Sequence, residues 1–248
     1  MPHPELEYTP GLRRGRRGKA VRRVQEWLSL QGFGLVTDGV FGPATEFALQ
    51  VFQRRSLLPI TGRMNRRTFA ALTEPLARTL EGSSTGGTLR TKLRYYARTH
   101  LRQEPREIGG QNKGPWVRAY MDGREGRQYP WCAGFVCTLL AQACEELGRT
   151  LPIVPSVSVD RLAGSAKNTG RFLVGRDDRP RSTLRAGDIF LVRRTAQDWT
   201  HTGVVMRVHD EVMLTVEGNT NDDGSREGYE VCQRVRNYRR KDFILLFD

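Results

Sequence analysis

The first third of the chain carries apolar residues at helical spacing. A first helix is predicted from an apolar face formed by Val21, Val24, Trp27 and Leu28. A second helix follows the turn at residues 38–39 and begins at Pro43, and its predicted buried face consists of Phe47, Ala48, Val51 and Phe52. After another turn at residues 61–62, a short third helix carries Phe69 and Leu72. We therefore predict a small all-α, three-helix domain over residues 1–73, with residues 1–10 as a loose leader.

The pattern changes after residue 73. Residues 74–88 are rich in Ser, Thr and Gly in their second half and predict a flexible linker. Residues 89–248 start with helical periodicity in the amphipathic run Leu89, Leu93, Tyr96, Ala97 and Leu101. Later runs are rich in β-formers and separated by turns, at residues 189–192, 203–208, 212–217, 229–235 and 243–247. Helices followed by an antiparallel sheet predict an α+β domain.

Residues 130–136 (PWCAGFV) open an almost wholly apolar helical run, which Gly148 is placed to end. Cys132 falls in the first turn of this predicted helix. There the unpaired backbone N–H groups and the positive end of the helix dipole favour the thiolate over the thiol. The pattern therefore makes Cys132 a candidate nucleophile. The alternative is an unreactive core residue, since free cysteine is among the most buried residue types.

A cysteine nucleophile needs a base, and three histidines follow the linker. His100 falls on the polar part of a helix, and His209 falls in a charged turn, so both are expected to be solvated. His201 meets an apolar strand, where Gly203 allows close approach of the backbone. The sequence favours His201 as the base, although a structural histidine at a strand end is the alternative.

Glu217 and Asn219 are two residues apart on the next predicted strand, so they are expected to share a face. If that strand pairs with the strand of His201, both side chains can approach the imidazole. One can orient the ring, and the other can bond a neighbouring backbone group or the substrate. The alternative is turn chemistry, because the sequence NTNDDG that follows is typical of a loop.

Composition limits the classes of protein to consider. With 248 residues, of which 38% are hydrophobic and 27% charged, the chain suits one or two globular domains. Its four cysteines are too few for a disulfide scaffold, and none of their spacings is C-x-x-C. We expect no metal site and no cofactor, and we interpret Cys137, Cys144 and Cys232 as small apolar residues.

The net charge of +13 comes nearly all from arginine and implies a polyanionic partner. Envelope polymers, anionic lipid and nucleic acid are the candidates. No stacking aromatics or recognition helix accompany the arginines, so nucleic acid is not expected. The N-terminus has no apolar signal-peptide core, and no apolar run is long enough to span a membrane. We expect a monomer made in the cytoplasm without membrane insertion.

Residues 11–73 resemble the peptidoglycan-binding module common in cell-wall hydrolases. The matching positions are Gly15, Gly18, Val21, Val24, Gln25, Leu28, Gly32, Asp38, Gly39, Phe41, Gly42, Thr45, Phe52, Gln53, Gly62 and Thr68. The resemblance implies a three-helix fold that holds an enzyme against the bacterial wall, with Asp38, Phe41 and Gln53 as candidate wall contacts. A small helical domain for some other partner is the alternative.

Residues 89–248 resemble the CHAP family (cysteine, histidine-dependent amidohydrolase/peptidase), a papain-like group of peptidoglycan hydrolases. The match rests on residues 109–114 (GGQNKG), 130–133 (PWCA), 187–189 (GDI), 201–205 (HTGVV) and 217–219 (EGN). It implies a papain-like α+β fold with Cys132 as nucleophile and His201 as general base. It also implies that Glu217 and Asn219 orient the histidine.

Three functions remain open at this point. The first is a peptidoglycan hydrolase that cuts an amide bond, either as an N-acetylmuramoyl-L-alanine amidase or as an endopeptidase. A phage endolysin acting on the host wall, or an exported antibacterial effector, would fit it. The second is a non-catalytic wall-binding structural protein, against which the intact Cys, His, Glu and Asn set argues. The third, nucleic-acid binding, rests on charge alone.

Some members of the CHAP family bind calcium through acidic residues just before the nucleophile. Here Asp122 and Glu125 are interleaved with Arg124 and Arg127, which makes a poor site for a hard cation. We therefore predict activity without calcium, so a chelator should leave cleavage of peptidoglycan unchanged. Loss of activity on chelation that added calcium restores would contradict this prediction.

Overall fold

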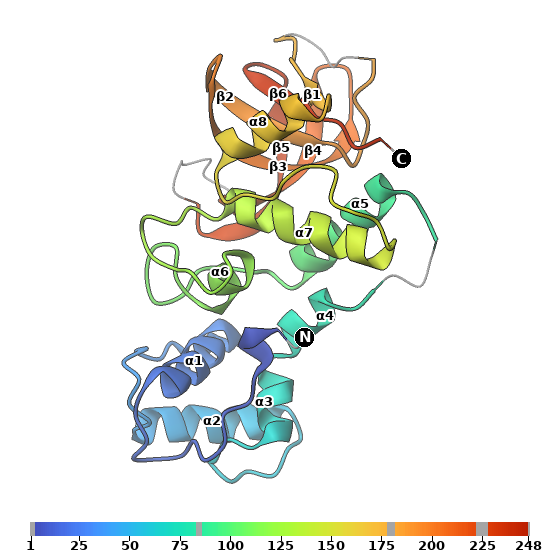
Figure 1. Cartoon of the computed structure of the whole chain (residues 1–248). Coiled ribbons are helices and arrows are strands. Elements are labelled where there is room, and N and C mark those ends of the chain that lie inside the picture. The colour runs from blue at the N-terminus through green and yellow to red at the C-terminus, as the bar shows by residue number, and fades with distance from the viewer. Residues whose placement is uncertain (1–2, 83–85, 178–181, 222–227, 248) are drawn as a thin grey trace. The chain divides into compact units, whose positions relative to one another are not determined.

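The structure is a computed structural model that describes residues 3–82, 86–177, 182–221 and 228–247 (Figure 1). Contacts within the chain divide it into two compact units. Unit 1 comprises the segments Met1–Arg78 and Arg106–Arg127, and unit 2 comprises Thr79–Pro105 and Gln128–Asp248. The mixture of helices with an antiparallel sheet confirms the predicted α+β class.

Unit 1 is helical. Its elements are η1 (Pro4–Leu6), α1 (Lys19–Leu28), η2 (Ser29–Phe33), α2 (Pro43–Arg55), α3 (Arg66–Leu72), most of α4 (Glu74–Thr79) and α6 (Pro115–Tyr120). The predicted apolar face of α1 is buried in full. The predicted face of α2 is partly wrong, because Phe47 is 68% exposed. The face that packs inward runs through Thr45, Ala48, Leu49, Phe52 and Gln53 at spacings of three and four residues, and Phe47 lies outside that stripe.

Two buried glutamines repeat one device in unit 1. Gln25 on α1 accepts from the Gly39 N–H at 2.8 Å and donates to the Thr45 hydroxyl at 3.1 Å. Gln53 on α2 accepts from the Gly62 N–H at 3.0 Å and donates to the hydroxyl of Thr68 at 3.3 Å. Each glutamine thus ties a glycine turn to the next helix.

Those turns need glycine for a conformational reason. Gly39 has φ 74° and Gly62 has φ 64°, in the left-handed region that other residues avoid. The two turns therefore depend on glycine for their backbone and on the buried glutamines for their polar partners.

Residues 106–127 pack with the N-terminal helices in unit 1. The Trp116 ring meets the Trp27 ring edge-on, with ring centres 5.8 Å apart, and the Arg106 guanidinium donates to the Leu30 carbonyl at 3.2 Å. The compact units therefore differ from the predicted domains 1–73 and 89–248. The predicted linker 74–88 also begins with a helix, α4. Periodicity shows that a segment is helical, but it does not show which unit the segment packs on.

Unit 2 holds a six-stranded antiparallel sheet. Its strands are β1 (Phe172–Leu173), β2 (Ile189–Thr195), β3 (Asp198–Val208), β4 (Val212–Thr220), β5 (Glu230–Asn237) and β6 (Lys241–Ile244), in the spatial order β1-β6-β2-β3-β4-β5. Helices α5 (Leu89–Arg102) and α7 (Cys132–Glu146) pack on each other and on β3 and β4 (Figure 1). Helix α8 (Val159–Asn168) packs on β3 and β1.

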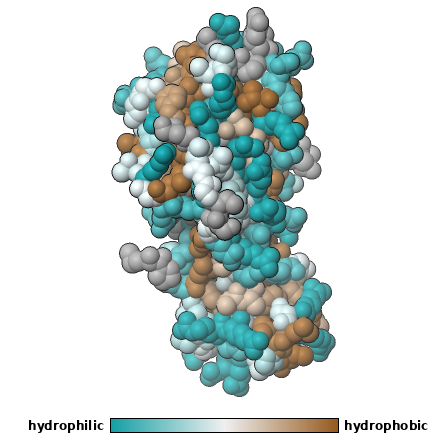
Figure 2. Space-filling model, turned by 90° about the vertical axis from the view of Figure 1, so that its right-hand side faces the viewer, coloured by the Kyte–Doolittle hydropathy of each residue, from teal (hydrophilic) through white to brown (hydrophobic). Residues whose placement is uncertain are grey.

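The face of the sheet that carries Phe190, Val205 and Met213 forms an apolar cluster with Leu184, Tyr238, Phe243 and Leu245. This cluster gives the strands beside the candidate site a rigid support. Within the described part of the chain, no helix has the length and apolar character needed to cross a membrane. On the face shown in Figure 2, hydrophilic residues are interspersed with hydrophobic ones.

Candidate active site

Cys132 is the first residue of α7, as the sequence predicts. Trp131 is the N-cap residue, and no side chain caps the helix there. As in any α-helix, the N–H groups of the first turn have no partner within the helix. They lie at the N-terminal end of α7, the same end as the Cys132 sulfur. Only 3% of Cys132 is exposed, and Gly148 follows the helix with φ 62°, as expected of a residue that ends it.

His201 lies on β3 and is held between its neighbours. Its Nε2 atom lies 2.8 Å from Glu217 Oε2, and its ring packs on Phe190 with ring centres 6.2 Å apart. The Cys132 side chain also acts on the imidazole and favours its charged form. Because Glu217 takes Nε2, Nδ1 is the nitrogen that remains for the sulfur. The structure thus brings together three of the four residues predicted for catalysis.

The environment of His201 favours its charged form. Burial lowers the pKa of the imidazole, but the hydrogen bonds and opposite charges of Cys132 and Glu217 outweigh that effect and raise the pKa to about 9. An imidazolium paired with a thiolate is the reactive form of a cysteine–histidine couple. This arrangement can therefore supply a nucleophile and a proton donor at neutral pH.

Glu217 on β4 is fully buried and has all its acceptor capacity in use. Besides His201, its carboxylate accepts two bonds from Arg236, at 2.8 Å and 2.6 Å, and one from the Thr215 hydroxyl at 2.5 Å. Burial alone would raise the pKa of this carboxyl, yet the Arg236 and His201 contacts lower it to about 2. Glu217 is therefore a carboxylate throughout the physiological pH range.

Gly203 makes room for this carboxylate, in agreement with the close approach predicted there. A Cβ atom at Gly203 would lie 2.8 Å from Glu217 Cγ and 2.8 Å from Phe190 Cε1. Phe190 pairs with Gly203 across β2 and β3, so the side chains on both sides pass over the bare glycine. Any larger residue would push Glu217 away from His201.

Asn219 does not follow the simple alternation expected from its spacing. The pairing of β4 with β5 shifts register between Glu217 and Thr220, and Asn219 has φ 54° in the left-handed region. Its side chain is 7% exposed, and the buried Oδ1 atom has no hydrogen-bond partner among the described residues. No hydrogen bond links Asn219 to His201 within that part of the chain. A role for Asn219 in orienting the ring stays a prediction.

The other histidines do not take part in this arrangement. His209 is exposed in the turn between β3 and β4, as expected. The expectation of a solvated His100 is wrong, because its side chain is 1% exposed and its Nε2 lies 3.0 Å from Gln142 Oε1 on α7. Burial lowers the pKa of His100 to about 4, which keeps it neutral. His100 packs edge-on against Phe135 and supports the helix of Cys132.

None of the four cysteines forms a disulfide. Cys144 is buried, as predicted, whereas Cys137 and Cys232 are half-buried. The Cys137 thiol donates to the Ser156 carbonyl at 3.4 Å, and burial raises its pKa to about 11. Cys137 is therefore a poor nucleophile at neutral pH, in contrast to the pairing of Cys132 with His201.

Two of the three candidate wall contacts in unit 1 are buried. Phe41 and Gln53 have no exposed surface, and the side-chain amide oxygen of Gln53 accepts a hydrogen bond from the backbone N–H of Gly62. Direct contact of either side chain with the wall does not fit this geometry. Asp38 is exposed, but it accepts from the Val40 N–H at 2.8 Å and the Gln25 amide at 2.9 Å. All three residues therefore stabilise the fold of unit 1. A structural role of this kind, like a role in binding, can explain why a residue belongs to the pattern of the peptidoglycan-binding module.

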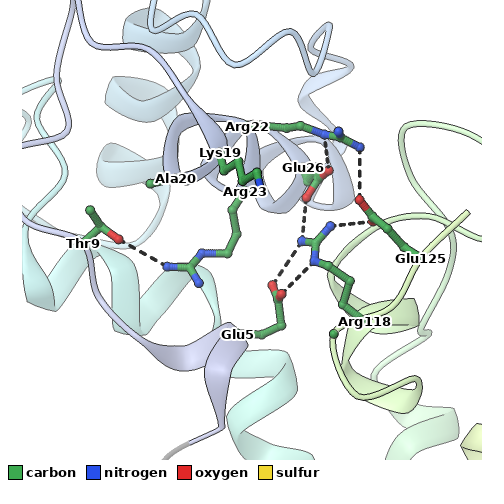
Figure 3. Close-up of a pocket in the computed structure, with 10 residues that line it drawn as sticks. Glu5, Thr9, Lys19, Ala20, Arg22, Arg23, Glu26, Arg118 and Glu125 are labelled. Atoms are coloured by element: carbon green, nitrogen blue, oxygen red, sulfur yellow. Dashed lines mark hydrogen bonds and ion pairs between the residues drawn. The ribbon is translucent and has the colours of Figure 1, made fainter.

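A charged cluster lines a pocket of about 400 Å³ in unit 1 (Figure 3). The guanidinium of Arg118 donates at 2.7 Å to each of the three carboxylates Glu5, Glu26 and Glu125. Arg22 donates to Glu26 at 2.9 Å and to Glu125 at 3.5 Å. Arg118 therefore joins the leader, α1 and the loop that precedes Cys132 in the sequence.

Glu125 belongs to the acidic segment considered for calcium. Burial raises the pKa of its carboxyl, but the Gly114 N–H and the Arg118 guanidinium outweigh burial and hold the pKa below its usual range. Its charge is already compensated by these partners. Among the residues described here, no group of three His, Cys, Asp or Glu side chains is placed to hold a metal ion. Activity without calcium stays a prediction.

Sequence reasoning missed Arg236, Thr215 and Arg118. Arg236 lies on β5, a segment that the sequence predicts to be β-rich without indicating a role for its arginines. The available signal was alternation, because Cys232, Arg234 and Arg236 share one face of β5, and β5 pairs with the strand of Glu217. A buried carboxylate is costly unless a cation pairs with it, so a carboxylate on one strand predicts an arginine or lysine on the neighbouring strand.

Two protein-family models match the chain. A peptidoglycan binding domain matches residues 17–72, within unit 1. A CHAP domain matches residues 124–219, a range that contains Cys132, His201, Glu217 and Asn219 but ends before Arg236. No curated protein matches the chain. The two matches confirm the modular order expected from the sequence.

We predict that Gly203→Ala displaces Glu217 and destabilises unit 2 by about 2 kcal/mol, the usual cost of overpacking. Denaturant unfolding of the variant measures this loss. Gly164→Ala in α8 is the matched control, because a Cβ there meets nothing within 4 Å. Equal stability of the two variants would contradict the crowding seen at Gly203.

Proposed function

We propose that this peptidoglycan hydrolase, which joins a peptidoglycan-binding domain to a CHAP domain, cuts an amide bond of the wall with Cys132 as its nucleophile. The observation that carries the proposal is the chain of contacts from Cys132 through His201 to Glu217. It supplies a nucleophile, a base and an orienting carboxylate. The bond is either the amide between muramic acid and L-alanine or a peptide bond of the stem or bridge.

In the first half of the proposed reaction, Cys132 Sγ attacks the carbonyl carbon of the amide. The oxyanion that forms can be bound by the Cys132 backbone N–H at the start of α7, where the helix dipole favours negative charge. His201 gives its proton to the nitrogen of the leaving amine as the C–N bond breaks. This leaves a thioester on Cys132 and a neutral imidazole.

In the second half, His201 takes a proton from water, and the hydroxide attacks the thioester carbonyl. The C–S bond breaks, the carboxylic acid leaves, and the thiolate–imidazolium pair is restored. Glu217 stabilises the charged histidine in both halves. Because its pKa is about 2, the carboxylate keeps its charge at every pH at which the cysteine can act.

The proposal includes a biological role. An endolysin that opens the host wall needs both a wall-binding and a wall-cleaving domain, and this chain carries both. An exported antibacterial effector would use the same pairing, so the endolysin role rests on the modular pattern alone. The intact contacts of Cys132, His201 and Glu217 argue against a non-catalytic structural protein.

We predict that Cys132→Ala abolishes release of soluble fragments from purified sacculi, because Cys132 is the thiol that acts on His201 in the described part of the chain. Mass spectrometry of the products measures release and identifies the bond cut. Activity of the unchanged protein should fall as the pH rises through about 9, where His201 loses the proton that it gives to the leaving amine.

Cys137→Ala is the matched control, since it removes a thiol from the same helix without touching His201. It should keep wild-type release. Equal release by the Cys132→Ala variant and the unchanged protein would end the cysteine mechanism.

We also propose that unit 1 contacts anionic polymers of the envelope. Arg13, Arg16 and Arg63 are exposed, and none has an ion pair with an acidic side chain in the described part of the chain. The backbone bond from Met64 N–H to the Leu12 carbonyl, at 2.9 Å, places the segment of Arg13 beside that of Arg63. Unpaired arginines on adjoining segments favour a phosphate-bearing polymer.

We predict that binding of the inactive Cys132→Ala protein to sacculi weakens as salt increases, and that Arg13→Gln combined with Arg63→Gln weakens this dependence. A pull-down at increasing sodium chloride measures both effects. Arg239→Gln combined with Arg240→Gln removes the same charge from unit 2 and should leave binding unchanged. Binding that is insensitive to salt would contradict the anionic partner.

A further inference from the structure

Arg236 is placed to act on the candidate site through Glu217. It lies opposite Met213 in the pairing of β4 with β5, and Glu217 lies opposite Cys232. Met213, Thr215 and Glu217 alternate on one face of β4, and Arg236 shares that face from the neighbouring strand. The two long side chains extend along their strands and meet beside Thr215.

The contact between the two side chains is bidentate. Arg236 Nε donates to Glu217 Oε1 at 2.8 Å, and a terminal nitrogen donates to Oε2 at 2.6 Å. This leaves Oε2 shared between Arg236 and His201, which faces it at 2.8 Å. A planar guanidinium fixes the plane of the carboxylate, and that plane sets the direction from which the imidazole is held.

The charges around Glu217 depend on this contact. Among the described residues, the charged and titratable groups that face the carboxylate are His201 on β3, Cys232 and Arg236 on β5, and Lys241 on β6. Lys241 donates to the Asn237 side chain and to a backbone carbonyl, not to Glu217. Burial and the repulsion of Arg236 also lower the pKa of Lys241 to about 8. Arg236 is therefore the permanent cation in direct contact with the carboxylate among these groups.

We propose that Arg236 is a positioning residue that keeps the buried Glu217 carboxylate ionised and oriented, so that Glu217 can hold His201 toward Cys132. This inference rests on the proposed cysteine mechanism and extends it to a residue outside the range 124–219 matched by the CHAP family. Arg236 itself touches neither the sulfur nor the imidazole in any contact that the structure describes. Its effect on the reaction passes through Glu217.

The consequence of losing Arg236 follows from burial. A fully buried carboxylate without a permanent cation takes up a proton more readily, so its pKa rises. Once Glu217 is protonated, it no longer stabilises the imidazolium, and the thiolate of Cys132 loses its counter-charge. The reactivity of Cys132 should then fall at a higher pH than in the unchanged protein.

The test uses the full-length protein and iodoacetamide, whose rate of reaction reports the thiolate of Cys132. The rate of carboxamidomethylation of the Cys132 peptide is followed by mass spectrometry from pH 4 to pH 10. Arg236→Met removes the charge, and Arg236→Lys keeps a charge without the planar fork. Arg234→Gln is the matched control, because it removes an arginine from the same face of β5, where its guanidinium bonds the Asn221 carbonyl and not Glu217.

We expect the acid limb of the profile to move up by about 1 pH unit or more in Arg236→Met. It should move by less in Arg236→Lys and stay in place in Arg234→Gln. Thermal unfolding of each variant separates loss of fold from a change in titration. If Arg236→Met is folded at 25 °C but keeps the wild-type profile, the inference is wrong. If Arg236→Met is unfolded at 25 °C, the pH profile of Arg236→Lys is used instead. A wild-type profile in Arg236→Lys would then contradict the inference.

The unchanged protein separates this inference from the proposed function. If Cys132 reacts no faster than Cys137 at any pH, the thiolate–imidazolium pair is absent and the mechanism itself fails. If Cys132 reacts with the expected pH dependence and the Arg236 variants do not alter it, only the role of Arg236 is contradicted.

Discussion

A carboxylate with no exposure to solvent can stay charged only when cations and hydrogen-bond donors replace the water it has lost. Glu217 meets this requirement with Arg236, Thr215 and His201. The rest of the site depends on that solution. The charge of Glu217 raises the pKa of His201, the protonated imidazole stabilises a thiolate, and the start of α7 places the Cys132 sulfur beside it. The glycine at position 203 is the steric condition for the same arrangement.

In unit 1, buried polar groups are likewise satisfied by hydrogen bonds and ion pairs within the protein. Gln25 and Gln53 satisfy the backbone of two turns from inside the helices, and Arg118 gathers three carboxylates into one cluster. The two glutamines are buried because they hold turns together, whereas Arg118 is only partly buried where it joins segments. The presence of both glutamines in the range matched by the peptidoglycan binding domain therefore reflects the fold, and contact with the wall is left to exposed side chains.

Much of the fold and the centre of the site could be predicted from the sequence. Helical spacing identified α1 and α7, and the position of Cys132 at a helix start depends only on local pattern. His201 and Glu217 could be paired because strand alternation and hairpin order are local as well. Alternation could have placed Arg236 on one face of its strand, but its partner depends on the register between β4 and β5. Phe47 and His100 were misjudged for a related reason, because burial is a property of the tertiary structure. The register shift at Asn219 also leaves no trace in residue spacing.

The central claim is that Glu217 and Cys132 hold His201 as an imidazolium at neutral pH. An NMR titration of the His201 ring in the full-length protein, assigned by its loss in His201→Gln, measures this directly. We expect a pKa near 9 for His201 in the unchanged protein, and a pKa that falls toward the ordinary value of about 6.5 in Glu217→Gln. A pKa near 6.5 in the unchanged protein, or one that Glu217→Gln does not alter, would contradict it.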